Sequence, residues 1–164
     1  MIVADTSALI SIASIDLLDT LLAEFEIHTT ETVVRELEET AEYEDRHGEA
    51  AAAVLNQISE ITIHSTETVQ TRSSRIDAGE ASTIELVNKE KTDFLITDDL
   101  RALPELQPVV NCRVAISPIV LKALVKKELL TRDQALSKVD RLAHQRDWLG
   151  APIYRRARNL FENH

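Results

Sequence analysis

The chain has 164 residues, of which 44% are hydrophobic and 28% charged. These values fit one globular domain, and with only one cysteine, Cys112, they exclude a disulfide scaffold as well as disordered and collagen-like chains. No apolar run reaches the roughly 18 residues of a membrane span, and the N-terminus lacks the basic region of a signal peptide. We therefore expect no membrane partner and a location in the reducing cytoplasm.

The formal net charge of −10 is unevenly distributed along the chain. Residues 117–164 hold ten basic and five acidic side chains, whereas residues 1–116 hold 8 basic and 23 acidic ones. The acidic body does not attract nucleic acid by its bulk charge. The basic tail is either a phosphate-contacting face or a solvated pair of amphipathic helices.

Short strands alternate with helices over the first two thirds of the chain. Apolar runs predict strands over 1–4, 26–29, 61–64, 93–97 and 113–116. Helical spacing predicts helices over 15–25, over the residues from a Thr30 or Thr32 cap to Ala41, over 50–58, and over 78–91 with Asp77 as its cap. The alternation predicts an α/β fold, a three-layer α/β/α sandwich with a short central parallel sheet.

Helices alone are predicted for the end of the chain. Ser117 and Pro118 have the pattern of a helix start, and that helix is predicted to run through Leu130. Residues 131–134 form a capping-box pattern, and a last basic helix is predicted over 153–161 after a break at 150–152. We therefore expect a core over 1–116 and a C-terminal helical extension over 117–164, packed on the same domain.

Acidic residues follow two of the predicted strands. Asp5 comes directly after the first strand, and Asp98 and Asp99 follow the 93–97 strand. The carboxyl ends of parallel strands share one edge of the sheet, where ligand sites form in open α/β folds. The sequence therefore predicts that these carboxylates lie near one another.

Two predicted helices add further acids. Glu80 lies within about 60° of Ile84 and Val87, on the face expected to be buried, and Glu36 flanks the apolar stripe of its helix. Taken alone, Glu80 is also a favourable acid at a helix N-terminus, and Glu36 an ordinary charge at the rim of a helix. Together with the strand-end acids they need a cation to stay ionised, and oxygen ligands suit Mg²⁺ or Mn²⁺.

Four sequence segments resemble the motifs of the PIN-domain family, in order and in spacing. They are VADTSALI with Asp5, VVRELEE with Glu36, DAGEASTIEL with Glu80, and DFLITDD with Asp98 and Asp99. The resemblance spans about residues 1–116 and is closest to the archaeal and bacterial branch whose third motif reads Gly-Glu-Ala. It implies a compact α/β/α fold and a metal-dependent ribonuclease, and many such domains are toxins of VapBC-type toxin–antitoxin pairs.

The resemblance implies roles for individual residues. It gives Asp5, Glu36, Glu80 and Asp99 as catalytic acids, Asp5, Glu80 and Asp99 as metal ligands with Asp98 as a second candidate, and Thr6, Ser7 and Thr97 as supporting hydroxyls. Glu80 departs from the family pattern, which usually has Asp there. The longer side chain keeps the charge but changes its reach.

The function expected from this resemblance is metal-dependent hydrolysis of RNA phosphodiester bonds, with Mg²⁺ or Mn²⁺ as cofactor. RNA contacts are expected from Arg101, Lys126 and Lys127, and the further partners open to such a chain are a cognate antitoxin and a homodimer. The alternative is a weakly active or inactive module that binds RNA or protein. A receiver domain or a haloacid-dehalogenase-type phosphatase fits poorly, because the first strand is followed by Asp5 without a second acid.

Overall fold

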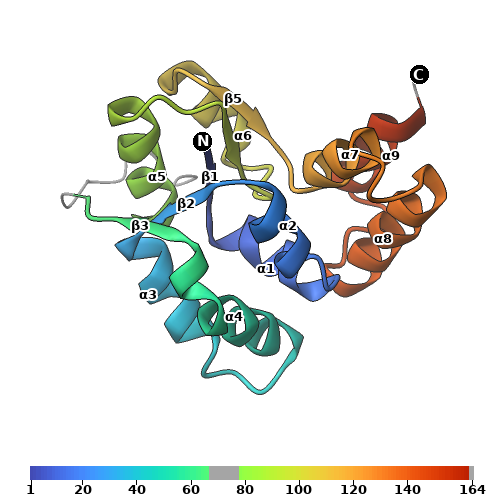
Figure 1. Cartoon of the computed structure of the whole chain (residues 1–164), viewed down its shortest axis with the longest axis horizontal. Coiled ribbons are helices and arrows are strands. Elements are labelled where there is room, and N and C mark those ends of the chain that lie inside the picture. Colours follow the sequence, from blue (N-terminus) through green and yellow to red (C-terminus); the bar gives the residue numbers. More distant parts are fainter. Residues whose placement is uncertain (67–77, 163–164) are drawn as a thin grey trace.

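The computed structural model describes residues 1–66 and 78–162 (Figure 1). At its centre lies a five-stranded sheet in the order β3-β2-β1-β4-β5, and every pairing is parallel. The strands are β1 (Ile2–Ala4), β2 (Ile27–Thr30), β3 (Thr62–His64), β4 (Phe94–Ile96) and β5 (Arg113–Ala115). The predicted parallel sheet is therefore confirmed, with strands three or four residues long.

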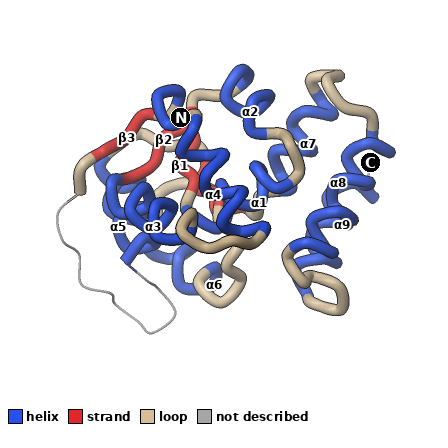
Figure 2. The backbone as a smooth tube through the Cα atoms, turned by 90° about the horizontal axis from the view of Figure 1, so that it is seen from below, coloured by secondary structure: helices blue, strands red, loops and turns tan. Residues whose placement is uncertain are grey.

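Helices flank this sheet and complete a three-layer α/β/α sandwich, which confirms the predicted fold class (Figures 1 and 2). They are α1 (Thr6–Ser14), α2 (Leu18–Glu24), α3 (Glu31–Thr40), α4 (Arg46–Asn56), α5 (Ala78–Lys89), α6 (Leu103–Leu106), α7 (Pro118–Lys126), α8 (Arg132–Gln145) and α9 (Pro152–Glu162). Among the described residues, no single helix is long and apolar enough to cross a membrane, although the bent pair α1 and α2 meets that length and composition when taken together.

The strand order places β1 at the centre of the molecule. Its residue Val3 pairs with His28 of β2 on one side and with Leu95 of β4 on the other. The chain runs outward from β1 to β2 and β3, then crosses back to β4. The boundary between β1 and β4 is therefore the point where the winding reverses, and it is there that clefts open in doubly wound sheets.

Helix α1 was not predicted, and the predicted start of α2 at residue 15 was wrong. Most of α1 is buried, namely Ala8, Leu9, Ile10, Ser11, Ile12 and Ala13. A helix buried on nearly all sides has no polar face, so it lacks the periodic pattern by which an amphipathic helix is recognised. Asp16, with φ 59°, reverses the chain before α2 begins at Leu18.

The helix caps agree with the sequence at two places and differ at a third. Thr30 caps α3 by accepting from the amide of Val33, and Thr131 and Gln134 form the predicted capping box of α8. Ser117 stands at the N-cap position of α7, but its side chain makes no capping hydrogen bond to the helix and donates to Asp98 instead. The predicted cap Asp77 lies outside the described residues.

The C-terminal helices α7, α8 and α9 pack on one another at one end of the molecule (Figures 1 and 2). They also contact the turn after α1: Lys138 Nζ donates to the Ile15 carbonyl at 2.9 Å, and Arg141 pairs with Asp16 at 3.0 Å. Apolar residues of these helices belong to the same core as the sheet. The domain boundary between residues 116 and 117 stays a prediction.

The Thr30 hydroxyl supports both α3 and α5, because it caps α3 and lies 2.6 Å from the Ser82 hydroxyl. We expect Thr30→Ala to lower the free energy of unfolding by about 1–3 kcal/mol in urea denaturation. The exposed cap variant Thr131→Ala serves as the control, with an expected loss of about 1 kcal/mol. Equal losses for the two variants would contradict the bridging role of Thr30.

Candidate active site

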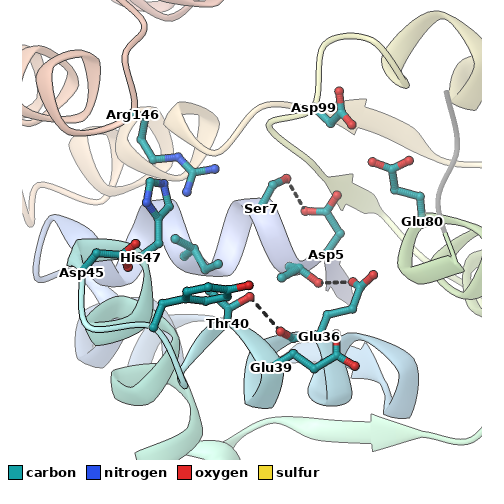
Figure 3. A pocket seen from close by; sticks show the side chains of 13 residues that line it. Asp5, Ser7, Glu36, Glu39, Thr40, Asp45, His47, Glu80, Asp99 and Arg146 are labelled. Carbon is teal, nitrogen blue, oxygen red and sulfur yellow. Dashed lines mark hydrogen bonds between the residues drawn. The ribbon is translucent and has the colours of Figure 1, made fainter.

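A pocket of about 580 Å³ opens at the carboxyl edge of β1 and β4. Residues from α1, α3, α5, the start of α4 and the loop after β4 form its walls (Figure 3). The lining residues are Asp5, Thr6, Ser7, Ile10, Glu36, Glu39, Thr40, Tyr43, Asp45, His47, Glu80, Asp99 and Arg146.

Asp5 links the central strand β1 to helix α1. Its backbone amide donates to the Ile96 carbonyl of β4, and its side chain caps α1 by accepting from the Ala8 amide at 2.9 Å. The same carboxylate oxygen accepts a hydrogen bond from the Ser7 hydroxyl at 2.8 Å. The side chain is only 3% exposed and lies at the base of the pocket.

Burial raises the pKa of Asp5 to about 7, against the opposing effect of hydrogen bonds from Thr97, Ala8 and Ser7. The nearby carboxyl of Asp98 adds a smaller upward shift of this pKa. A desolvated carboxylate is stabilised by a nearby cation, which lowers its pKa again. Asp5 is thus a group that a positive ligand in the pocket would ionise.

The end of β4 contributes Asp99 to the pocket. The Asp99 amide donates to the Thr97 hydroxyl at 3.2 Å, and Thr97 Oγ1 lies 3.4 Å from Ser7 Oγ. Asp99 Oδ1 accepts from the Arg101 amide at 3.0 Å, with the Arg101 side chain at 3.5 Å. The exposed Arg101 side chain therefore lies beside the acidic pocket without being part of its lining.

Asp98 is oriented away from the pocket. Its two carboxylate oxygens accept from the backbone amide and the hydroxyl of Ser117, each at 2.6 Å. The Asp98 amide in turn donates to Ser7 Oγ at 2.9 Å. This buried side chain thereby fastens the start of α7 to the end of β4, and of the two acids in sequence it is Asp99 that lines the pocket.

Glu36 reaches the pocket across a close approach between α3 and α5. Its Oε1 accepts from the Thr6 hydroxyl at 2.5 Å. A Cβ on Gly79 would clash with the same carboxylate oxygen, so a larger residue there would push the Glu36 side chain away from Thr6. Glu80, the next residue in the first turn of α5, is 4% exposed and lines the pocket beside Asp99 (Figure 3).

The structure thus brings Asp5, Glu36, Glu80 and Asp99 to one pocket together with Thr6 and Ser7. It does not bring Lys126 or Lys127 there. Lys126 borders a separate apolar groove over β1, β4 and β5, and Lys127 pairs with Glu24 at 3.5 Å.

Several pocket residues were missed from the sequence. Arg146 follows α8 in the C-terminal extension, and Tyr43, Asp45 and His47 come from the segment that joins α3 to α4. Arg146 is the cation in this lining, whereas Arg101 lies beside the pocket. No local pattern reveals this placement, since it depends on how the extension folds back over α1.

Burial lowers the pKa of Arg146, while the charges of Asp98 and Asp5 raise it in opposition. The side chain is half-buried and extends into the pocket from the side opposite to Glu80 (Figure 3). Asp5, Glu36, Glu80 and Asp99 therefore lie toward one end of the pocket, and the Arg146 guanidinium lies at the other end, where Asp45 is also found (Figure 3).

The different surroundings of Asp98 and Asp99 predict different effects of their removal. Asp98→Ala leaves the Ser117 amide and hydroxyl without their acceptor, so we expect the free energy of unfolding to fall by about 1–3 kcal/mol. Asp99→Ala, at the pocket surface, is expected to change it by no more than about 1 kcal/mol. Urea denaturation at pH 7 in EDTA measures the free energy of unfolding of both variants. Equal losses of stability would contradict a structural role for Asp98.

Comparison with known proteins gives a family match over nearly the whole chain. The model of the DUF3368 family, which is described as a PIN domain, matches residues 1–163. No curated protein and no solved structure matches the chain. PIN domains are generally nucleases that use divalent metals and bind nucleic acid substrates. The extent of the match shows that the chain belongs to the PIN-domain family.

Proposed function

We propose that the protein is a metal-dependent endoribonuclease that hydrolyses RNA phosphodiester bonds. One observation carries the proposal: Asp5, Glu36, Glu80 and Asp99, which are distant in sequence, line one pocket at the point where the winding of the sheet reverses. Family membership supports a nuclease-type function, and the choice of RNA as substrate is our inference.

The residues of the pocket fit a hard divalent cation. The donors are carboxylate and hydroxyl oxygens, which Mg²⁺ and Mn²⁺ prefer, and burial has raised the pKa of Asp5. Within residues 1–66 and 78–162, no three acidic, histidine or cysteine side chains already form a cluster able to hold a metal ion. We therefore propose Asp5, Glu80 and Asp99 as ligands that act partly through water, as Mg²⁺ sites commonly do.

A bound divalent ion would supply charge stabilisation for a phosphodiester under attack. The chain itself supplies orientation and a base. We assign to Glu36, held by Thr6 at 2.5 Å, the orientation of the attacking water and acceptance of its proton. A new bond forms between the water oxygen and phosphorus as the bond to the leaving ribose oxygen breaks, and that oxygen takes up a proton from solvent water. Ser7 holds Asp5 in place during this exchange.

Finer parts of the proposal are supported by the motifs alone. They are membership of a VapBC-type toxin–antitoxin pair, a cognate antitoxin, a homodimer, and action in the cytoplasm. Arg101 is proposed as an RNA contact at the edge of the pocket, because its side chain is exposed and lies beside Asp99. For Lys126 and Lys127 an RNA contact would have to form outside this pocket.

The first test is cleavage of a mixed pool of structured RNA with Mn²⁺, with Mg²⁺ and with EDTA. We expect the wild type to cleave only with metal, and Asp5→Asn to lower the rate at least about 100-fold, because the catalytic charge stabilisation is lost. Asp19→Asn, which removes an exposed acid on α2, is the matched control and should cleave as the wild type does.

Cleavage by Asp5→Asn at the wild-type rate would refute the proposed site. No cleavage with either metal, together with clear RNA binding, would favour the non-cleaving binding module instead.

A second test uses stability without any substrate. The raised pKa means that folded Asp5 keeps its proton between about pH 4 and 7 while the unfolded chain releases it, so its contribution to stability falls as pH rises through that window. In EDTA at pH 8 we expect Asp5→Asn to be more stable than the wild type by on the order of 2 kcal/mol, and this difference to vanish near pH 4.

Denaturation midpoints across this pH range measure the effect. Addition of Mn²⁺ at pH 8 should reverse the order, because only the wild type gains binding free energy. A difference between the two proteins that does not change with pH would contradict the account of Asp5.

A further inference from the structure

Arg146 is a cation from the C-terminal extension that extends into the acidic pocket. Its backbone amide donates to the Leu142 carbonyl at the end of α8, which fixes where the side chain starts. Figure 3 shows the guanidinium above His47 and on the opposite side of the pocket from Glu80. The mechanism proposed above relies on the carboxylates and assigns no role to Arg146.

The guanidinium interacts with nearby charge without a direct partner. The charges of Asp98 and Asp5 act on it, yet within the described parts of the chain its N–H groups make no hydrogen bond and no ion pair. The oxygens of Asp98 are occupied by Ser117, and Asp5 Oδ1 by Ser7 and Ala8. A half-buried guanidinium with free donors is a ready site for an anion, and its planar fork matches a phosphate.

The pocket also carries an exposed aromatic ring, on the segment that leads to His47. Tyr43 is 67% exposed and lines the pocket, although aromatic residues make up only 4% of the chain. Its backbone is held firmly in place: the Tyr43 amide donates to the Thr40 carbonyl, and a Cβ on Gly48 would come within 1.8 Å of the Tyr43 carbonyl oxygen. The exposed ring on this segment therefore has a face available to a stacked base.

We propose that Arg146 and Tyr43 form a nucleotide subsite for single-stranded RNA next to the scissile phosphate. Arg146 binds the neighbouring backbone phosphate, and the ring of Tyr43 stacks on an unpaired base. A duplex keeps its base faces covered, so the subsite selects single-stranded segments. This inference rests on the proposed function, because the carboxylate end of the pocket is assigned to the bond that is cleaved.

The test measures equilibrium binding of a short fluorescent single-stranded RNA in the cleavage-deficient Asp5→Asn background with Mn²⁺. We expect Arg146→Gln to weaken binding about tenfold or more, as loss of a charge-assisted contact does. Arg156→Gln removes the same charge from the exposed face of α9 and should change binding less than about twofold. Equal effects of the two substitutions would overturn the phosphate contact.

Substitutions of Tyr43 test the stacking part. Tyr43→Ala is expected to weaken binding at least about fivefold, and Tyr43→Phe to restore it, since the ring alone stacks. Double-stranded RNA of the same sequence should compete poorly. Failure of Tyr43→Phe to restore binding, or equal competition by the duplex, would overturn the single-strand subsite.

Calorimetry then measures the Mn²⁺ affinity of Arg146→Gln in a protein that keeps Asp5. This measurement distinguishes a contact of Arg146 with RNA from a role of Arg146 in positioning the carboxylates. Removal of a nearby positive charge should leave Mn²⁺ affinity unchanged or increase it in Arg146→Gln. Weaker Mn²⁺ binding would show that Arg146 positions the acids, and would overturn the proposal. If the wild type neither binds Mn²⁺ nor cleaves RNA, the nuclease proposal fails, whereas normal cleavage with RNA binding insensitive to Arg146→Gln refutes only the subsite.

Discussion

The sheet, the first helix and the pocket meet at one buried carboxyl group at the end of the central strand. Asp5 connects β1 to β4 through its backbone and starts α1 through its side chain. A carboxylate in this place costs free energy when it ionises, and the surrounding hydroxyls offset only part of that cost. The fold therefore places at the base of this pocket a carboxyl group whose ionised form a positively charged ligand would stabilise. A cation that bound beside Asp5 would therefore also stabilise the fold.

The geometry of a parallel sheet made the acidic residues the most predictable part of the candidate site. Asp5 and Asp99 follow strands whose carboxyl ends must meet, so the strand pattern alone brings them together. Glu80 was identified from the sequence because it lies on the buried face of its helix, where an unpaired charge costs free energy. The choice between Asp98 and Asp99 needed the structure, since their side chains diverge only through the hydrogen bonds of Asp98 to Ser117.

The features that escaped prediction share a dependence on distant contacts. Helix α1 is buried on nearly all sides, so its sequence carries no amphipathic signal. Arg146 reaches the pocket only because α8 packs over the turn after α1, where Lys138 and Arg141 hold it. Neither spacing nor composition encodes that contact. The extension, expected as an appendage of the core, supplies part of the pocket wall.

Where α3 approaches α5, Glu36 and Gly79 share one limited space. The carboxylate of Glu36 fills the space that a side chain at position 79 would need. A larger residue at 79 would displace this carboxylate, whereas a shorter acid at 36 would leave room for it, so the two sites are expected to vary together. The width of this end of the pocket is thus set by the Glu36 side chain where it lies against Gly79. A change at either position alone would therefore alter where this carboxylate lies in the pocket.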